Sequence, residues 1–319
     1  MPDVRARHAL GAVQRLPHDR VERLAALGRR CREPRVPLIL KRFRQAVLAA
    51  ACSGAFTSGG AGGDTLPAGW RMACIDDLAA PGGLFDGARD HGSQTAVAQN
   101  LRTVDYTTSG VRVVRLENLG HLKFINDKYT FISYEKYEGL KQSTIQPGDI
   151  LFGSFVEDSV RVCLLPRLET PAISKADCFC IRVRPEAVLR DYLVLQLATR
   201  RTHDALVEDV HGATRPRIAT KHLRALQVPM CSLEEQTAIV EIVRQHFALA
   251  DAIEHRVQAA TARAGKLPEA ILSKAFSGEL VPTEAELARA QGRTYETAAD
   301  GLERVRREAE NGRRSTRDR

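Results

Sequence analysis

A short helical motif occurs twice in this chain, once on each side of a long segment of different character. The first copy is LKRFRQAVLAAACSGAFT at residues 40–57, and the second is AGKLPEAILSKAFSGELV at residues 264–281. Aligned without gaps, the copies share two alanines, one leucine and a Ser-Gly pair. A repeat that brackets a different segment predicts the order helix, globular module, helix, in which both copies play equivalent structural roles.

The first copy lies in an amphipathic helix. Apolar residues recur at spacings of three and four from Leu40 to Cys52, so residues 38–57 are predicted to contain a helix. Residues 58–65 are rich in glycine and are predicted to be a linker that separates this helix from the next domain. Residues 1–37 form an Arg-rich N-terminal arm, with an imperfect helical pattern.

The second copy ends a much longer predicted helix, residues 233–277. Ser232 and Glu235 have the spacing of a capping box, which opens a helix. The apolar positions that follow alternate spacings of four and three, as in a coiled-coil seam, with His246 as the polar member. A helix of this length needs a partner helix. Pro268, together with the glycine three residues before it, predicts a kink or two helices that meet end to end.

The segment between the helices, residues 66–232, has the pattern of strands. Short alternating or apolar runs are bounded by turn residues, and one helix is predicted over residues 191–207. The segment is therefore predicted to be an α+β domain with a curved, mostly antiparallel sheet. Residues 278–319 are a charged tail with short predicted helices. The runs that indicate strands are residues 111–116, 148–155, 160–165 and 178–183.

Composition favours a polyanionic partner. The chain has 47 Lys and Arg against 39 Asp and Glu, a formal net charge of +8, and 44% hydrophobic residues, enough for a sizeable core. A basic protein binds nucleic acid by neutralising phosphates and releasing counterions, although many other soluble proteins are equally basic. Charge therefore suggests nucleic acid without establishing it.

Cysteine usage and hydropathy indicate a cytoplasmic protein. The seven cysteines are scattered without a CxxC pair, which favours reduced thiols. Cys178 and Cys180 fall on one face of a predicted strand and are interpreted as small packing residues. No apolar run approaches the roughly 20 residues of a membrane span, and the N-terminus lacks the apolar stretch of a signal peptide.

From about Leu38 to about Glu308, the order of sequence blocks resembles the specificity subunits of type I restriction-modification systems. The helix end that occurs twice is part of this resemblance, as is the closing segment AFSGELVPTEAELARAQGR. The blocks between them are LPAGW (66–70), GVRVVRLENL (110–119), PGDILFGS (147–154), ADCFCIRVRP (176–185) and GATRPRIATKHLRALQVPMCSLEEQ (212–236).

The resemblance implies a sequence-specific DNA-binding subunit without a catalytic centre. Subunits of that family normally carry two target recognition domains, read a split site in double-stranded DNA, and hold modification and restriction subunits. Adenine methylation and ATP-driven cleavage, with their S-adenosylmethionine, ATP and Mg²⁺, would belong to those partners, and no cofactor to this chain. This chain has one recognition domain and resembles the second half of such a subunit. It is either a natural half that forms a homodimer or a fragment of a longer protein.

A DNA-reading domain needs cations at phosphates and forked or amide donors at base edges. The segment before the long helix supplies the most, and Thr220 is predicted to cap a short helix whose N-terminus would favour a phosphate. The alternative is that this segment is a structural lock between the domain and the long helix. Its candidate residues are Thr214, Arg215, Arg217, Thr220 and Lys221.

Further candidates are distributed along the predicted strands, and for each the alternative is an ordinary solvated side chain. They are Arg115, Asn118, Lys123, Lys128, Ser154, Arg161 and Lys175.

The sequence shows no constellation for catalysis. An adenine methyltransferase needs a Gly-rich cofactor loop after a first strand and an Asn- or Asp-Pro-Pro-aromatic motif, and neither occurs. Asp149, Glu157 and Asp158 lack the nearby lysine of a metal-dependent nuclease, and the nine histidines show no paired metal spacing. The rival interpretations are an assembly protein that does not bind DNA and a cryptic nuclease.

Overall fold

The computed structural model describes residues 35–57, 66–88, 101–156, 158–208, 217–277 and 279–315, with side chains described as far as residue 308. Most of the N-terminal arm and the whole Gly-rich linker lie outside the described residues. The chain divides into two compact units, of which Val36–Glu254 contains the strands, and the other includes His255–Arg319.

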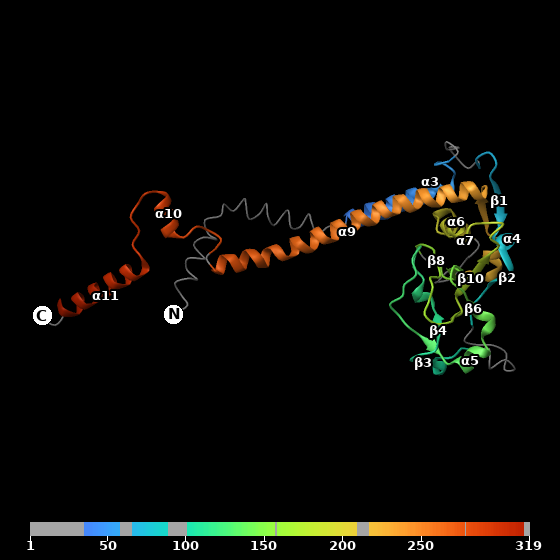
Figure 1. The fold of residues 1–319 in the computed structure, drawn as a ribbon, viewed down its shortest axis with the longest axis horizontal. Coiled ribbons are helices and arrows are strands. Elements are labelled where there is room, and N and C mark those ends of the chain that lie inside the picture. The colour runs from blue at the N-terminus through green and yellow to red at the C-terminus, as the bar shows by residue number, and fades with distance from the viewer. Residues whose placement is uncertain are drawn as a thin grey trace. The chain divides into compact units, whose positions relative to one another are not determined.

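The strands of the first unit form three sheets (Figure 1). A two-stranded antiparallel sheet pairs β1 (Arg71–Cys74) with β11 (Gln227–Met230). A four-stranded antiparallel sheet has the order β2 (Ala79–Phe85), β10 (Cys178–Val183), β7 (Ile150–Gly153) and β8 (Val162–Leu164). A five-stranded sheet has the order β3 (Tyr106–Thr107), β5 (Phe131–Ile132), β4 (Val111–Val114), β9 (Ala172–Ser174) and β6 (Thr144–Ile145), with β4 and β9 parallel.

The predicted α+β class is confirmed, with mostly antiparallel strands. Short helices connect the strands of the first unit, and three of the connections are single 3₁₀ turns. The helices are α4 (Ile75–Leu78), α5 (Tyr134–Glu138), α6 (Arg190–Leu197), α7 (Arg200–Glu208) and α8 (Thr220–Ala225), and the turns are η2 (Thr103–Asp105), η3 (Leu116–Asn118) and η4 (Lys141–Ser143).

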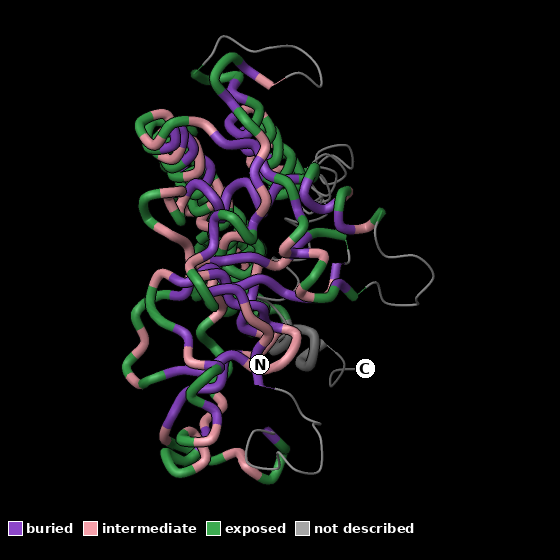
Figure 2. The backbone as a smooth tube through the Cα atoms, turned by 90° about the vertical axis from the view of Figure 1, so that its right-hand side faces the viewer, coloured by how far each residue is buried: buried purple, intermediate pink, exposed green. Residues whose placement is uncertain are grey.

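The alternation of side chains along β10 shows how the layers are built. Phe179 and Ile181 point into a core shared with the helices, while Cys178 and Cys180 point into a second apolar cluster with Val114 of the five-stranded sheet. Both faces of β10 are therefore covered. Figure 2 shows buried residues following the strands through the centre of this unit. Burial raises the pKa of the Cys180 thiol, which makes it an inert packing residue, as the sequence suggested.

Helix α3 (Arg35–Cys52) packs along the first part of α9 (Leu233–Ser277), and Figure 1 shows the two side by side. The His246 ring lies between two phenylalanines, with its centroid 5.6 Å from that of Phe56 and 6.2 Å from that of Phe43. Arg44 Nη2 donates to Asp251 Oδ1 (2.6 Å) and Glu254 Oε2 (2.8 Å). This part of the seam thus has aromatic packing around its polar member and an ion-pair network beside it.

Two helix predictions need correction. The structure has one uninterrupted helix through Pro268, not two helices that meet there. The single helix predicted over residues 191–207 is two helices, α6 and α7. Thr199 separates them because its Oγ1 accepts a hydrogen bond from the Thr202 backbone N–H (3.3 Å) and so caps the second helix. The second unit contains α10 (Glu284–Ala290), opened by a capping box, and α11 (Ala298–Ser315).

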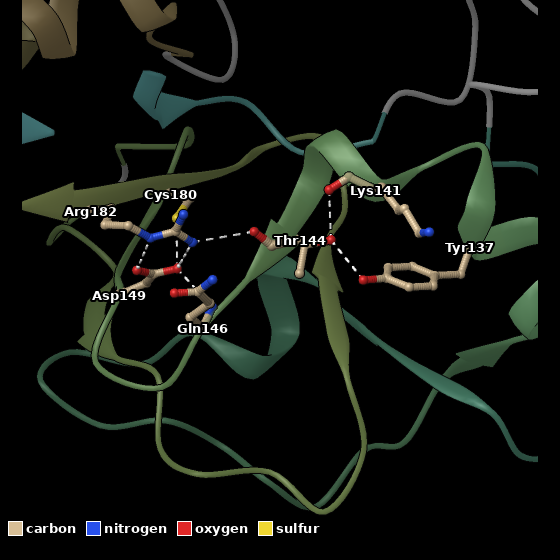
Figure 3. Close-up of polar contacts among 7 residues, drawn as sticks. All are labelled: Tyr137, Lys141, Thr144, Gln146, Asp149, Cys180 and Arg182. Atoms are coloured by element: carbon tan, nitrogen blue, oxygen red, sulfur yellow. Dashed lines mark hydrogen bonds and ion pairs between the residues drawn. The ribbon is translucent and has the colours of Figure 1, made fainter. Parts of the chain in front are cut away.

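An ion pair links Asp149, the residue before β7, to Arg182 in β10 (Figure 3). Asp149, which is 4% exposed, accepts from Arg182 Nε (2.9 Å) and Nη2 (2.7 Å), and also from the Gln146 backbone N–H (2.7 Å). The carboxylate raises the pKa of the Arg182 guanidinium. Asp149 therefore has a structural role, since its oxygens are already occupied by donors of this chain.

Candidate nucleic-acid interface

Several strands of the first unit end side by side, and basic residues stand at their ends. Arg115 follows β4 and Lys175 follows β9, and the two strands are held together there because Lys175 N donates to the Val114 carbonyl (2.9 Å). Across the adjoining strands, Gly153 N donates to the carbonyl of Arg161 (2.8 Å). Pairing of β4 with β9 thus brings Arg115 and Lys175 together, and Gly153 lies beside both Arg161 and Leu116, the residue after Arg115.

A fourth cation, Arg217, comes from the C-terminal part of the domain's sequence. Its segment forms an isolated bridge with Phe155, and the Arg217 guanidinium carbon lies 5.8 Å from the centroid of the Phe155 ring. Arg217 also forms an ion pair with Asp177 in the turn after β9, and its side chain is 54% exposed. We call Arg115, Arg161, Lys175 and Arg217 the strand-end cluster.

A tyrosine lies under two members of this cluster. The Tyr106 ring centroid is 5.9 Å from the Arg115 guanidinium carbon and 5.6 Å from Lys175 Nζ. The Tyr106 hydroxyl is buried and has no hydrogen-bond partner among the described residues. Cation–π contacts of this kind hold the cationic stems in place while their charges stay near the surface.

Two of the predicted DNA-binding residues are buried and fully used inside the domain. Asn118 is 1% exposed, and its side chain bonds to the backbone of Arg115, Ile125 and Lys128 at 3.0–3.1 Å. Ser154 is fully buried, and its hydroxyl donates to Asp177 Oδ1 (2.8 Å). Neither side chain is available to a base or phosphate in this structure, so both predictions are corrected to structural roles.

Lys123 and Lys128 are exposed on the loop that Asn118 holds. The Lys128 side chain is 61% exposed, and its Nζ lies 3.7 Å from Glu117 Oε2. Glu117 also bonds to Arg115 (3.3 Å) and so connects this loop to the strand-end cluster. Lys128 is therefore linked to the strand-end cluster through a shared carboxylate, and Lys123 is exposed on the same loop.

The segment before the long helix is only partly described. Thr214 and Arg215 lie outside the described residues. Thr220 is the first residue of α8 rather than its cap: Ala219 occupies the cap position, and no side chain caps there. Lys221 is exposed. The helix is anchored within the domain by buried Leu223 and by Arg224, which bonds to Asp76 and to the Leu84 carbonyl (2.6 Å). A lock between the domain and α9 stays a prediction.

Arg112 and Tyr129 were not among the DNA-binding residues predicted from the sequence. Arg112 lies in the middle of β4 and is 3% exposed, and burial lowers the pKa of its guanidinium. Its guanidinium carbon lies 4.2 Å from the ring centroid of Tyr129, which is 62% exposed. An arginine inside an apolar strand was the signal that could have drawn attention to it.

Among the described residues, no group of three or more His, Cys, Asp or Glu could hold a metal ion.

Comparison with known proteins identifies the domain. Residues 115–261 match the family described as the type I restriction modification DNA specificity domain. This chain is similar to type I restriction enzyme specificity subunits. It is 28% identical over 265 residues to the EcoBI specificity subunit of Escherichia coli and 30% identical over 263 residues to the StySPI specificity subunit of Salmonella potsdam.

The relatives are longer than this chain. The two alignments cover 79% of this chain and 52% of each relative, so the chain spans about half their length. A solved chain from a study of complex assembly and conformational transition of the type I R-M system has the same fold. The superposition covers 83% of this chain and 61% of the solved chain, with a TM-score of 0.56 and 21% sequence identity.

The matched range of the specificity-domain family covers the basic surface. It begins at Arg115 and includes every member of the strand-end cluster, the loop with Lys123 and Lys128, and the first part of α9. No helix in the described part of the chain is long and apolar enough to cross a membrane.

Proposed function

We propose that residues 66–232 bind double-stranded DNA at a specific sequence and serve as one recognition domain of a type I restriction-modification assembly. The observation that carries the proposal is the strand-end cluster, to which separate segments of the range that matches the DNA specificity domain contribute four cations near the ends of strands. A surface built in this way suits a phosphate backbone, because each cation neutralises charge without sequence preference.

Sequence reading would come from side chains beside these phosphate contacts. The cluster's arginines have forked donors that suit guanine edges, and the Arg115 and Arg217 side chains are 38% and 54% exposed. Each is held by an acidic neighbour, Glu117 or Asp177, and lies near an aromatic ring. Preorganised arginines lose less conformational entropy on binding, which favours specific contacts.

Chemistry would belong to partner subunits. Modification subunits would methylate adenine with S-adenosylmethionine, and a restriction subunit would cleave DNA with ATP and Mg²⁺. This chain would select the site and bind none of the three. The helices α3 and α9 are the proposed docking elements. Since the chain spans about half of its relatives, it would act either as a homodimer or together with a missing second recognition domain.

Duplex selection from a random-sequence pool by the purified chain tests DNA recognition. Arg115→Glu and Arg217→Glu together are expected to weaken binding strongly and to reduce the slope of log affinity against log salt by about two, because two phosphate or base cations are lost. Arg244→Glu is the matched control, since Arg244 is 65% exposed on α9 outside the cluster. Unchanged binding by the double variant would instead favour an assembly protein that does not bind DNA.

Co-expression with a modification subunit in a methylation-free host tests the role in the assembly. Mapping of methylated adenines is expected to give a bipartite motif. A palindromic motif would mean that two copies of this chain form one recognition unit. If a competent, soluble modification subunit gives no methylation, the missing half is required.

A further inference from the structure

We infer that Tyr129 is a DNA-contacting residue whose ring packs against sugar and base-edge atoms in a groove, while Lys128 meets the neighbouring phosphate. This inference rests on the proposed function and adds to it a residue that the strand-end cluster does not include.

The Tyr129 ring is exposed and at the same time supported. The residue is 62% exposed, although an aromatic side chain gains free energy from burial. The Arg112 guanidinium lies over one side of the ring, 4.2 Å from its centroid, and the Phe131 ring lies at 6.4 Å with an interplanar angle of 15°. The rest of the ring faces solvent and is available to a ligand.

The backbone around Tyr129 is held in place on both sides. Arg112 Nη2 donates to Asn126 Oδ1 (3.3 Å) and to the carbonyl of Lys128, and that carbonyl also accepts from Asn118. After Tyr129, the Thr130 carbonyl accepts from the Val113 N–H (2.8 Å). A ring presented on a fixed backbone loses little entropy on binding, which is the property expected of a recognition residue.

The charge below the ring favours an anionic ligand. Arg112 Nε and Nη1 are buried and have no hydrogen-bond partner in the described part of the chain. Residues 110–131 contain four Lys and Arg against two Asp and Glu. DNA offers both an apolar surface for the ring and phosphates for the charge, whereas an apolar protein surface would pay to desolvate Lys128, which is 61% exposed.

Tyr129 also lies at the end of the basic surface described above. Glu117 bonds to Arg115 of the strand-end cluster and to Lys128, the residue before Tyr129. A duplex lying across the cluster can therefore reach the ring without any change in the domain.

The test compares Tyr129→Ala and Tyr129→Phe, using the duplex that the wild-type chain selects from a random pool and a mixed-sequence duplex. Loss of one aromatic contact is expected to weaken binding of the selected duplex about tenfold and to lower its preference over the mixed duplex. The salt slope should stay unchanged because no cation is lost. The Phe variant keeps the ring and should bind within about twofold of wild type. Tyr295→Ala, at a tyrosine 41% exposed, is the matched control.

The outcomes separate this inference from the function on which it rests. If Tyr129→Ala binds like wild type while the double reversal of Arg115 and Arg217 abolishes binding, the inference is wrong and the proposed function stands. If the wild-type chain binds no duplex, both are wrong. If Tyr129→Ala keeps DNA binding but loses capture of a modification subunit, the ring belongs to a protein interface and the inference is overturned.

Discussion

The strands of the recognition domain contain two arginines that the fold holds in very different ways, Arg182 in β10 and Arg112 in β4. Arg182 forms two hydrogen bonds to the buried carboxylate of Asp149, at 2.9 and 2.7 Å. Arg112 is itself 3% exposed, yet it bonds only to an amide oxygen and a backbone carbonyl among the described residues, and two of its nitrogens have no partner there. A buried charge lowers stability unless it is paired. Arg182 meets this condition through Asp149, whereas Arg112 has no carboxylate partner among the described residues.

The difference separates a structural ion pair from a site that is prepared for a ligand. The Asp149–Arg182 pair links the residue before β7 to β10, and both carboxylate oxygens of Asp149 bond to donors of this chain. Arg112 lies below the exposed Tyr129 ring, next to exposed lysines. An uncompensated cation at such a position is expected to contribute less to stability than to binding.

The largest expected effect is that of Arg182→Met. The variant leaves the buried Asp149 carboxylate without a counter-charge, so the free energy of unfolding should fall by about 3 kcal/mol. Urea denaturation measures it. The double variant Asp149→Asn/Arg182→Met should recover more than half of the loss, because no stranded charge remains.

Arg184→Met is the matched control for that experiment. Arg184 lies two residues further along and donates to a backbone carbonyl, that of Asp77, instead of a carboxylate. Its loss should cost about 1 kcal/mol or less. Equal effects of the two arginine substitutions would show that Asp149 does not depend on its partner.

Asn118→Ala has the next largest expected effect. It removes three hydrogen bonds and leaves the Arg115 N–H and the Ile125 carbonyl without the Asn118 partner, while the Lys128 carbonyl keeps its bond from Arg112, so the free energy of unfolding should fall by about 2 kcal/mol. The loop that covers Arg112 should also loosen, measurable as faster amide hydrogen exchange at Ile125. The exposed Asn126→Ala is the control, and a similar loss there would refute the anchoring role of Asn118.

These residues also show how far the sequence could predict the site. Arg115 was named from the sequence because it lies near the end of a predicted strand, and Arg217 because its segment is rich in cations. Asn118 and Ser154 follow strands in the same way, yet they are buried. The partner of Ser154 is Asp177, and the position of that turn depends on pairings between distant strands. Local pattern cannot distinguish these cases.

Fold class and the two helices that carry the repeated motif were predictable, since they depend on periodicity and on that repeat. The division into three sheets was not, because β1 pairs with β11 from the other end of the domain. Arg112 was missed for a related reason. Its neighbours Val111 and Val113 gave the segment an apolar pattern, and the burial of the alternate position follows from the loop that folds over it.

Arg112→Met should have the smallest effect on stability and is the sharpest test of the contrast with Arg182. Methionine keeps most of the apolar volume, and no carboxylate is left without a partner. The Lys128 carbonyl still accepts from Asn118. The free energy of unfolding should therefore change by about 1 kcal/mol or less, whereas affinity for the selected duplex should fall about tenfold as the Tyr129 ring loses its support. Unfolding and DNA titration on the same preparation measure both. A loss of stability as large as that of Arg182→Met, with DNA affinity unchanged, would mean that Arg112 is an ordinary core residue and that the two arginines do not differ in kind.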